Sequence, residues 1–474
     1  MAFDGSKRNM KPRSGNGFAH REGRGQTAAG GLASRRVALD TLLDVSRSDA
    51  YASLALEKRL DQSHLSQRDR AFVTRLVYGT IENRIQLDWL IDSFLEENKE
   101  IEPVLREILR MGAFQIFKLD RVPDMAAVNE SVSLTRSMGL ESFTGLANAV
   151  LRNMIRQKDS IEWPRPQEDP VRYLSILFSA PEELCRLLID AWGEHTALEI
   201  LRYRPDTRTV DVRANALRCT PERLRRLMAE EELHWQEGTV PGVLKVQNAG
   251  DLTRLRAFQN GLFTIQGESS VLAARAVHAK PGQTVLDACA APGGKSAVLA
   301  EDMKGSGRVY AWDTHAHRVE LIQKTVKRLF LDNVRPMLRD ATQPRPEMAG
   351  TLDAALVDAP CSGTGVMTEK PDLKYRVTAE GVQSLCETQK AILDAVAPMV
   401  KPGGTLVYST CSVLPQENEK QVQAFLQRHG EYEVWPLAGE LPEALAAKEG
   451  EFGLQLFAHR DGMDGFYICR MRRK

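Results

Sequence analysis

The chain has 474 residues, of which 43% are hydrophobic, so it can fill several cores, and at about 100–200 residues per domain its length indicates two to four domains. Lys and Arg together number 63, as do Asp and Glu, and the net charge of zero gives no bulk evidence for a nucleic-acid or membrane partner. No apolar run approaches the roughly 20 residues that span a bilayer, and no signal-peptide pattern opens the chain, so we expect a cytoplasmic protein without a membrane partner.

The N-terminal part of the chain is expected to hold a tail and a helical domain. Residues 1–30 are rich in Gly, Ser, Lys and Arg and almost free of large aliphatic residues, which predicts a disordered basic tail. From Ser34 to about Arg156 the apolar residues recur at helical spacing, and Gly and Pro separate the segments. This pattern predicts an all-α bundle over residues 31–160.

The rest of the chain divides into two further predicted domains. After a Pro-containing linker, residues 170–262 mix helical stretches with short β-type runs, which predicts a small α+β domain. Residues 263–474 alternate apolar strands with helices, which predicts an α/β, Rossmann-like, doubly wound parallel sheet. Ligands of such sheets bind outside the carboxyl ends of the strands. The expected strands cover residues 284–287, 308–313, 334–339, 352–358 and 404–409.

A loop with two glycines follows the first strand of this sheet. Gly293 and Gly294 permit a close backbone approach and the next helix offers its N-terminus, as in a cradle for a nucleotide-type cofactor. The spacing fits neither GxGxxG nor a P-loop, which favours an adenosyl cofactor; a plain strand-to-helix turn is the alternative. Asp313 is placed to bind ribose hydroxyls, and Asp340 an adenine amine. The expected cofactor residues of the loop are Cys289, Ala290, Ala291, Pro292, Gly293, Gly294 and Lys295.

Two cysteines follow strand ends that face the same cleft. Asp358 ends the fourth strand in an acid-x-Pro-Cys motif that includes Cys361, and Cys411 follows the fifth strand. The motif resembles the polar-Pro-Pro-aromatic motif of amino-group methyltransferases, with a thiol in place of the aromatic ring. Because C5 of a pyrimidine is too weak a nucleophile to attack a methyl sulfonium directly, a thiolate must first add at C6, and Asp358 could then bond N3. Spacing leaves open which cysteine attacks, and buried packing is the alternative for each.

The other cysteines indicate free thiols in a reducing compartment. The seven cysteines form no CxxC pair, which argues against a disulfide framework and a zinc site, so we expect no metal. Cys289 lies in the cofactor loop, where packing is its expected role. Four cysteines have no motif around them: Cys185, Cys219, Cys386 and Cys469.

Several segments resemble those of a known family. DACAAPGGKS, DAPCSGTG, PDLKYR, STCS with PQENE, and DGMDGFYICRMRR are similar to segments of the NOP2/Sun-type RNA 5-methylcytosine methyltransferases. RDRAFVTRLVYGTIENR, AVNESV and GLANAVLRN resemble the NusB-like RNA-binding domain of RsmB-type bacterial 16S rRNA methyltransferases. The resemblance covers about residues 30–474.

The resemblance implies an enzyme that transfers a methyl group from S-adenosylmethionine to C5 of one cytidine in 16S rRNA. It assigns Cys411 as the nucleophile and Cys361 to product release, and it places the cofactor at residues 289–295 and at Asp313, Asp340 and Asp358. A monomer is expected. Lys374 and Arg376 are candidate phosphate contacts, with an ordinary exposed surface as the alternative.

Two departures from the family pattern and three rival functions remain open. Residues 368–370 read Thr-Glu-Lys where the family often has basic residues, and residues 266–268 read Gln-Gly-Glu in place of the usual Gln-Asp. Methylation of tRNA or another RNA would use the same catalytic motifs. A non-catalytic assembly or antitermination factor would keep the fold, although both thiols and three strand-end acids argue against it. A nicotinamide dehydrogenase conflicts with the absence of GxGxxG.

Overall fold

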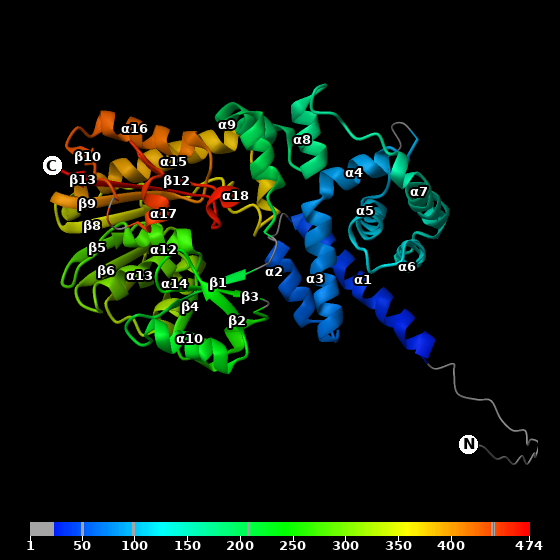
Figure 1. Cartoon of the computed structure of the whole chain (residues 1–474), viewed down its shortest axis with the longest axis horizontal. Coiled ribbons are helices and arrows are strands. Elements are labelled where there is room, and N and C mark those ends of the chain that lie inside the picture. The colour runs from blue at the N-terminus through cyan, green and yellow to red at the C-terminus, as the bar shows by residue number, and fades with distance from the viewer. Residues whose placement is uncertain are drawn as a thin grey trace, which may run out of the picture. The chain divides into compact units, whose positions relative to one another are not determined.

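The computed structural model describes residues 23–48, 52–96, 100–205, 209–247, 249–437, 439 and 441–474 (Figure 1). The chain divides into two compact units, Met1–Glu162 and Trp163–Lys474, which are described separately. Residues 1–22 of the predicted tail lie outside the described residues, whereas α1 (Gly23–Ser48) begins inside the segment assigned to the tail.

The first unit is a helical bundle, which confirms the predicted all-α domain. After α1 it comprises α2 (Ala52–Asp61), α3 (Gln67–Glu82), α4 (Arg84–Asp92), α5 (Pro103–Lys118), α6 (Asp124–Ser137) and α7 (Thr144–Gln157). Helix α5 is central and contacts α1, α3, α4, α6 and α7, and its Leu105, Ile108 and Leu109 are fully buried. A Cβ at Gly79 of α3 would lie 1.9 Å from the ring of Phe114 on α5, so the close approach of these two helices requires glycine.

The second unit begins with two helices, α8 (Pro170–Phe178) and α9 (Glu182–Arg202). Their buried residues share an apolar core with loops of the large sheet described below. Trp192 of α9 donates from Nε1 to the carbonyl of Val413 at 2.8 Å, and its ring packs edge to face on Phe457 at a centroid distance of 5.0 Å. These helices therefore support the loop that follows Cys411.

A small antiparallel sheet follows, in the order β2-β3-β1-β4. Its strands are β1 (Thr209–Ala214), β2 (His234–Glu237), β3 (Val243–Gln247) and β4 (Phe263–Ile265), and α10 (Pro221–Glu230) and α11 (Arg256–Gln259) lie between them in the chain. This is the expected α+β architecture. Because β4 pairs with β1, the small sheet extends past residue 262, where the sequence places its end.

The large sheet has nine strands in the order β11-β12-β13-β9-β8-β5-β6-β7, with β10 paired to β13. Five parallel strands form one part of it, and four strands join in antiparallel pairs. The parallel strands confirm the predicted doubly wound sheet, and the antiparallel strands make the whole sheet mixed. The strands are β5 (Thr284–Asp287), β6 (Arg308–Asp313), β7 (Val334–Leu338), β8 (Leu352–Asp358), β9 (Val400–Thr410), β10 (Tyr432–Val434), β11 (Glu449–Gly450), β12 (Gly453–Leu456) and β13 (Phe466–Arg473).

Helices cover both faces of this sheet (Figure 1). On one face α12 (Glu268–Arg275), α13 (Gly294–Asp302) and α14 (Ala316–Leu329) bury Val285, and on the other α15 (Ala379–Val396) and α16 (Glu419–Arg428) bury Leu286. Successive strand residues point to opposite faces, so a strand buried on both sides carries apolar residues at successive positions, as Val285 and Leu286 of β5 show. Two short helices, α17 (Glu443–Ala446) and α18 (Ala458–Asp461), precede β13 in the chain.

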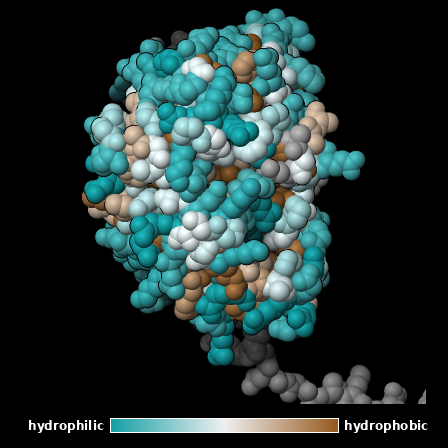
Figure 2. Space-filling view, turned by 90° about the vertical axis from the view of Figure 1, so that its left-hand side faces the viewer, coloured by the Kyte–Doolittle hydropathy of each residue, from teal (hydrophilic) through white to brown (hydrophobic). Residues whose placement is uncertain are grey.

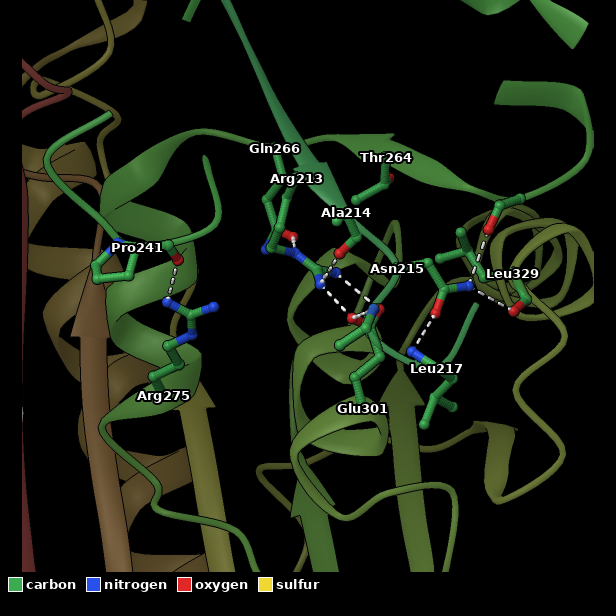
Figure 3. A network of polar contacts seen from close by, with 12 residues as sticks. Arg213, Ala214, Asn215, Leu217, Pro241, Thr264, Gln266, Arg275, Glu301 and Leu329 are labelled. Atoms are coloured by element: carbon green, nitrogen blue, oxygen red, sulfur yellow. Dashed lines mark hydrogen bonds and ion pairs between the residues drawn. The ribbon is translucent and has the colours of Figure 1, made fainter. Parts of the chain in front are cut away.

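A buried polar cluster joins the small sheet to α13 (Figure 3). Arg213 at the end of β1 and Glu301 on α13 form an ion pair whose side chains are 3% and 1% exposed. Arg213 Nη2 lies 3.0 Å from Glu301 Oε1, and Arg213 Nε donates to Gln266 Oε1 at 3.1 Å. Asn215 Nδ2 donates to the carbonyls of Gly261 and Leu329, at 2.9 Å each. The small sheet is therefore docked firmly against the larger one.

Hydrophilic residues predominate on the face shown in Figure 2, and hydrophobic residues gather there only in small groups. Such scattered apolar residues are usual on protein surfaces. Among the described residues, no helix combines the length and the apolar character needed to cross a membrane.

Candidate active site

The carboxyl ends of β5 and β8 lie side by side where the strand order reverses. From β5 the sheet continues through β6 and β7 on one side, and through β8 and β9 on the other. In open α/β sheets this position forms the crevice in which ligands bind. Asp287 ends β5 and Asp358 ends β8, so two acidic residues stand at this point.

The loop after β5 is held by backbone contacts. Ala290 N donates to the carbonyl of Trp312 at 2.8 Å, and Gly293 N donates to the carbonyl of Ala290 at 2.7 Å. Gly293 has a φ of 103°, and a Cβ there would lie 3.3 Å from Thr325, so the position suits only glycine. Because α13 starts at the next residue, the unpaired N–H groups of its first turn adjoin the loop.

Asp287 is a fully buried carboxyl group that the sequence did not mark as a site residue. Its Oδ2 accepts from Ser296 Oγ at 2.6 Å, and its Oδ1 has no well-aligned partner among the described residues. Burial raises the pKa of Asp287 to about 7, and the charge of Asp358 acts in the same direction. An unsatisfied buried acceptor fits a ligand that brings donors or a positive charge.

Two of the three predicted cofactor acids, Asp313 and Asp340, lie at or just beyond strand ends. Asp313 ends β6 with a side chain that is 3% exposed, and its Oδ1 accepts from the backbone N–H of His315 at 3.1 Å. Asp340 lies beyond the end of β7 and accepts from Thr342 N at 2.9 Å and from Thr342 Oγ1 at 2.7 Å. These hydrogen bonds lower the pKa of Asp340. Carboxylates at the ends of neighbouring strands fit the ribose hydroxyls, the amine and the sulfonium of an adenosyl cofactor.

Lys295 and Asp358 form an ion pair between the cofactor loop and the end of β8. Lys295 Nζ lies 2.8 Å from Asp358 Oδ2, and Ser409 Oγ donates to Asp358 Oδ1 at 2.9 Å. Burial alone would lower the pKa of Lys295, but the pair with Asp358 offsets this effect and raises the pKa. The Lys295 ammonium also stands 5.2 Å from the ring centroid of Phe466 on β13. A fixed positive charge thus lies between the predicted cofactor loop and the two predicted catalytic cysteines.

Cys361 and Cys411 lie together beyond the ends of β8 and β9. Their Sγ atoms are 3.2 Å apart, a hydrogen-bonding contact well beyond the roughly 2.05 Å of a disulfide bond. The structure therefore brings together two thiols that are fifty residues apart in the chain.

The two thiols differ in their readiness to ionise. A hydrogen bond from Cys361 lowers the pKa of Cys411 despite burial, and the positive charges of Lys295 and Lys370 act in the same direction. The same hydrogen bond, together with burial and the negative charge of Glu417, raises the pKa of Cys361. Of the two thiols, Cys411 therefore has the lower pKa and ionises more readily.

The loop that carries Cys361 packs on the segment before β13 without room for side chains. Gly365 N donates to the carbonyl of Cys411, and Gly465 N donates to the carbonyl of Gly365, both at 2.9 Å. A Cβ at Gly365 would lie 1.9 Å from the carbonyl oxygen of Gly465. Two glycines from distant motifs thus fix the position of the Cys361 loop.

The two candidate RNA contacts have different surroundings. Arg376 is exposed, as a phosphate contact requires. Lys374 is only 4% exposed, and its Nζ donates to the carbonyl of Phe178 on α8 at 3.1 Å. The placement of Lys374 is that of a structural lysine, because its charge is engaged inside the fold and is not presented to a ligand.

Residues without a motif of their own also reach the site. Cys289 in the cofactor loop is half-buried in the apolar core, and burial raises its pKa, as expected of a packing residue. Ser409 and Phe466 were not singled out as site residues by the sequence, because only the pairing of β8, β9 and β13 brings them to the site. Lys370, in the segment that follows the Cys361 motif, reaches Cys411 through its charge. Among the described residues, no group of three or more His, Cys, Asp or Glu side chains could hold a metal ion.

Comparison with known proteins gives two family matches: 16S rRNA methyltransferase RsmB/F over residues 274–472 and the NusB family over residues 32–156. Two relatives carry the name Probable ribosomal RNA small subunit methyltransferase B. The one from Bacillus subtilis is 37% identical over 442 residues, 93% of this chain and 98% of the relative. The one from Synechocystis sp. is 34% identical over 447 residues, 93% of this chain and 100% of the relative. The crystal structure of PH0851 shares the fold, with a TM-score of 0.78 at 24% identity over 93% of this chain and 99% of that one.

Proposed function

Because the chain belongs to the RsmB/F family of 16S rRNA methyltransferases, we propose that Cys411 is the nucleophile with which it methylates C5 of a 16S rRNA cytidine. The contact between Cys361 and Cys411, at 3.2 Å, carries this assignment. It lowers the pKa of Cys411 and so favours the thiolate, which is the form that adds to C6. Addition at C6 gives C5 the enamine character that methylation needs.

We propose Cys361 for product release. After methylation a water molecule takes the C5 proton, the electron pair of the C5–H bond forms the C5–C6 double bond, and the bond between C6 and the sulfur of Cys411 breaks, so Cys411 departs as a thiolate. The raised pKa of Cys361 keeps its S–H in place as a donor to that departing sulfur. A hydrogen bond to a charged group contributes about 1.5–3 kcal/mol, which corresponds to a rate factor of roughly 10–150.

The cofactor is S-adenosylmethionine, which when bound supplies the electrophilic methyl group. The loop at residues 289–295, with Asp313 and Asp340, would hold its adenosyl part. Asp287 offers a buried acceptor beside it. Asp358 stands between this loop and the thiols, where its carboxyl group can bond N3 of the cytosine while Lys295 holds its position at 2.8 Å.

We further propose that the target cytidine is unpaired or extruded, because a stacked base would block the approach of Cys411 to C6. The NusB-like unit would bind the RNA around the target, and Arg376 would contact a phosphate. We propose that the protein is a cytoplasmic monomer. Light scattering of the purified protein would test the monomeric state.

The experiment combines turnover with adduct trapping. Labelled S-adenosylmethionine is incubated with protein-free 16S rRNA and, in parallel, with tRNA, and nuclease digestion identifies the modified nucleoside. Cys361→Ala is expected to accumulate a covalent protein–RNA adduct and Cys411→Ala to form none. Cys219→Ala, which removes a buried thiol from the small domain, is the matched control and should behave as the parent.

The outcomes separate the alternatives. Label in 5-methylcytidine of 16S rRNA alone supports the proposed substrate, while label only in tRNA keeps the chemistry and changes the substrate. An adduct that accumulates with Cys411→Ala would reverse the roles of the two thiols. RNA binding without any turnover in the parent protein would support the alternative of a non-catalytic RNA-binding factor.

A further inference from the structure

Glu417 lies in the segment PQENE, and neither the sequence analysis nor the proposed mechanism assigns this residue a role. Its side chain is fully buried. Glu417 Oε1 accepts from Ser362 N at 2.8 Å and from Gln389 Nε2 at 3.1 Å. Its Oε2 accepts from Ser362 Oγ and from Ser412 Oγ, each at 2.5 Å. One carboxylate thus takes four hydrogen bonds from three residues.

Two of these donors are the residues that directly follow the reactive thiols. Ser362 follows Cys361 and Ser412 follows Cys411, so a single carboxylate bridges the two cysteine loops. We propose that Glu417 is a positioning residue that holds the two loops in the register at which the thiols meet at 3.2 Å. The proposal rests on the roles proposed above for Cys411 and Cys361.

Further hydrogen bonds extend the bridge and fix its geometry. Thr364 Oγ1 lies 3.0 Å from Ser412 Oγ and accepts from Val413 N at 3.0 Å, which ties the loops together a second time. Gln389 Nε2 also donates to the carbonyl of Pro360 at 3.0 Å, so α15 anchors the start of the Cys361 loop. These groups are buried or half-buried, where hydrogen bonds hold a network in place more strongly than in water. Gln389 Oε1 has no hydrogen-bond partner among the described residues, so Gln389 acts in the bridge through its Nε2 alone.

The four donors around Glu417 require a carboxylate and not a neutral amide of the same shape. A buried carboxylate is unfavourable unless several donors satisfy it, and the contacts of Glu417 in the described part of the chain are with neutral donors. A glutamine would keep the shape but would turn an N–H₂ group toward at least one hydroxyl or N–H donor. The negative charge of Glu417 also raises the pKa of Cys361, which supports the proposal because it keeps that thiol a donor.

The test compares Glu417→Gln with Glu419→Gln, an exposed glutamate two residues further along. In the full-length protein without RNA, alkylation of Cys361 and Cys411 by iodoacetamide is followed against pH by peptide mass spectrometry. Glu417→Gln should move the alkylation midpoint of Cys361 to lower pH and that of Cys411 to higher pH. It should also lower kcat about 10–100-fold with KM for RNA within twofold of the parent, whereas Glu419→Gln should change neither.

A second variant keeps the proposal testable if Glu417→Gln does not fold. Ser362→Ala removes one hydroxyl donor and retains the carboxylate, so it should lower kcat about tenfold. The alkylation of Cys361 should then no longer follow a single rate, because the Cys361 loop takes more than one position. If both variants fold, the double variant should be no slower than Glu417→Gln alone, because both act through the same bridge.

Three results would overturn the proposal: parental kcat in Glu417→Gln, parental kcat in Ser362→Ala, or a lower kcat with the alkylation profiles of both thiols unchanged. The last would assign Glu417 to stability alone. If the proposed function is wrong, the parent protein itself will show no turnover. The alkylation profiles of Cys361 and Cys411 need no RNA, so they would still test whether Glu417 positions the two thiols.

Discussion

The buried pair of Arg213 and Glu301 makes a quantitative prediction. With side chains 3% and 1% exposed, each charge depends on the other, and Glu301 Oε2 accepts in addition from Ala216 N at 2.8 Å. Arg213→Met would leave a buried carboxylate without its cation, a change that destabilises proteins by about 3–5 kcal/mol. The pair of Arg225 and Glu237 in the same domain lies at 2.7 Å but is 35% and 52% exposed, so solvent screens it and Arg225→Met should change the stability little.

Thermal unfolding monitored by circular dichroism distinguishes the two variants. At roughly 2–4 °C per kcal/mol for large domains, Arg213→Met should lower Tm of the second unit by roughly 6–20 °C, and Arg225→Met should lower it far less. Replacing both partners, as in Arg213→Met with Glu301→Leu, should recover much of the loss because no buried charge remains. The reasoning is refuted if the buried and exposed variants shift Tm equally, or if the double variant is less stable than Arg213→Met.

Four further substitutions test contacts at the site. Gly365→Ala should abolish methyl transfer and lower Tm, because the added Cβ would lie 1.9 Å from the carbonyl oxygen of Gly465. The pKa of Asp287 is raised by burial from 3.8 to about 7, so its contribution to stability is complete below about pH 4 and is lost as the pH rises through 7. The Tm of Asp287→Asn relative to the parent should therefore increase between pH 4 and pH 8, by an amount equivalent to no more than about 4 kcal/mol. Arg376→Ala should raise KM for RNA, whereas Lys374→Ala should lower Tm and leave KM for RNA unchanged.

Each of these changes has a control. Gly145→Ala introduces a Cβ with nothing within 4 Å and should leave both activity and Tm unaffected. A Tm difference for Asp287→Asn that is independent of pH would show that its carboxyl group is ionised to the same extent in the folded and unfolded chain. If Lys374→Ala raises KM for RNA at constant Tm, this lysine contacts the substrate after all.

The sequence predicts the parallel sheet well because each strand is a short apolar run that ends in a polar residue. Three of the five predicted strands, β5, β6 and β8, have the expected bounds. Strand β9 starts earlier than predicted, at Val400, because Pro402, Gly403 and Gly404 in the sequence indicate a turn and not a strand. The adjacency of Cys361 and Cys411 follows from the same pattern, since β8 and β9 are neighbours whose carboxyl ends meet at one edge.

What the sequence leaves open depends on contacts between distant segments. The burial of Lys374 arises from Phe178 on α8, almost two hundred residues earlier, and no local pattern encodes that contact. The bridge through Glu417 likewise joins two loops and α15, which only the completed fold brings together. The antiparallel strands β10–β13 were not predicted, because their short runs carry no repeated alternation with helices.

The place of β13 in the sheet has a consequence for the order of synthesis. Strand β13 lies between β9 and β12, and the residue before it, Gly465, contacts the Cys361 loop, yet it is the last strand of the sheet to be made. At about 5–20 residues per second, several seconds pass between the synthesis of Thr410 and that of Phe466. During that interval β9 lacks its β13 partner, and an unpaired strand edge is a template for pairing with another chain, so the last eight strand residues, 466–473, remove that edge.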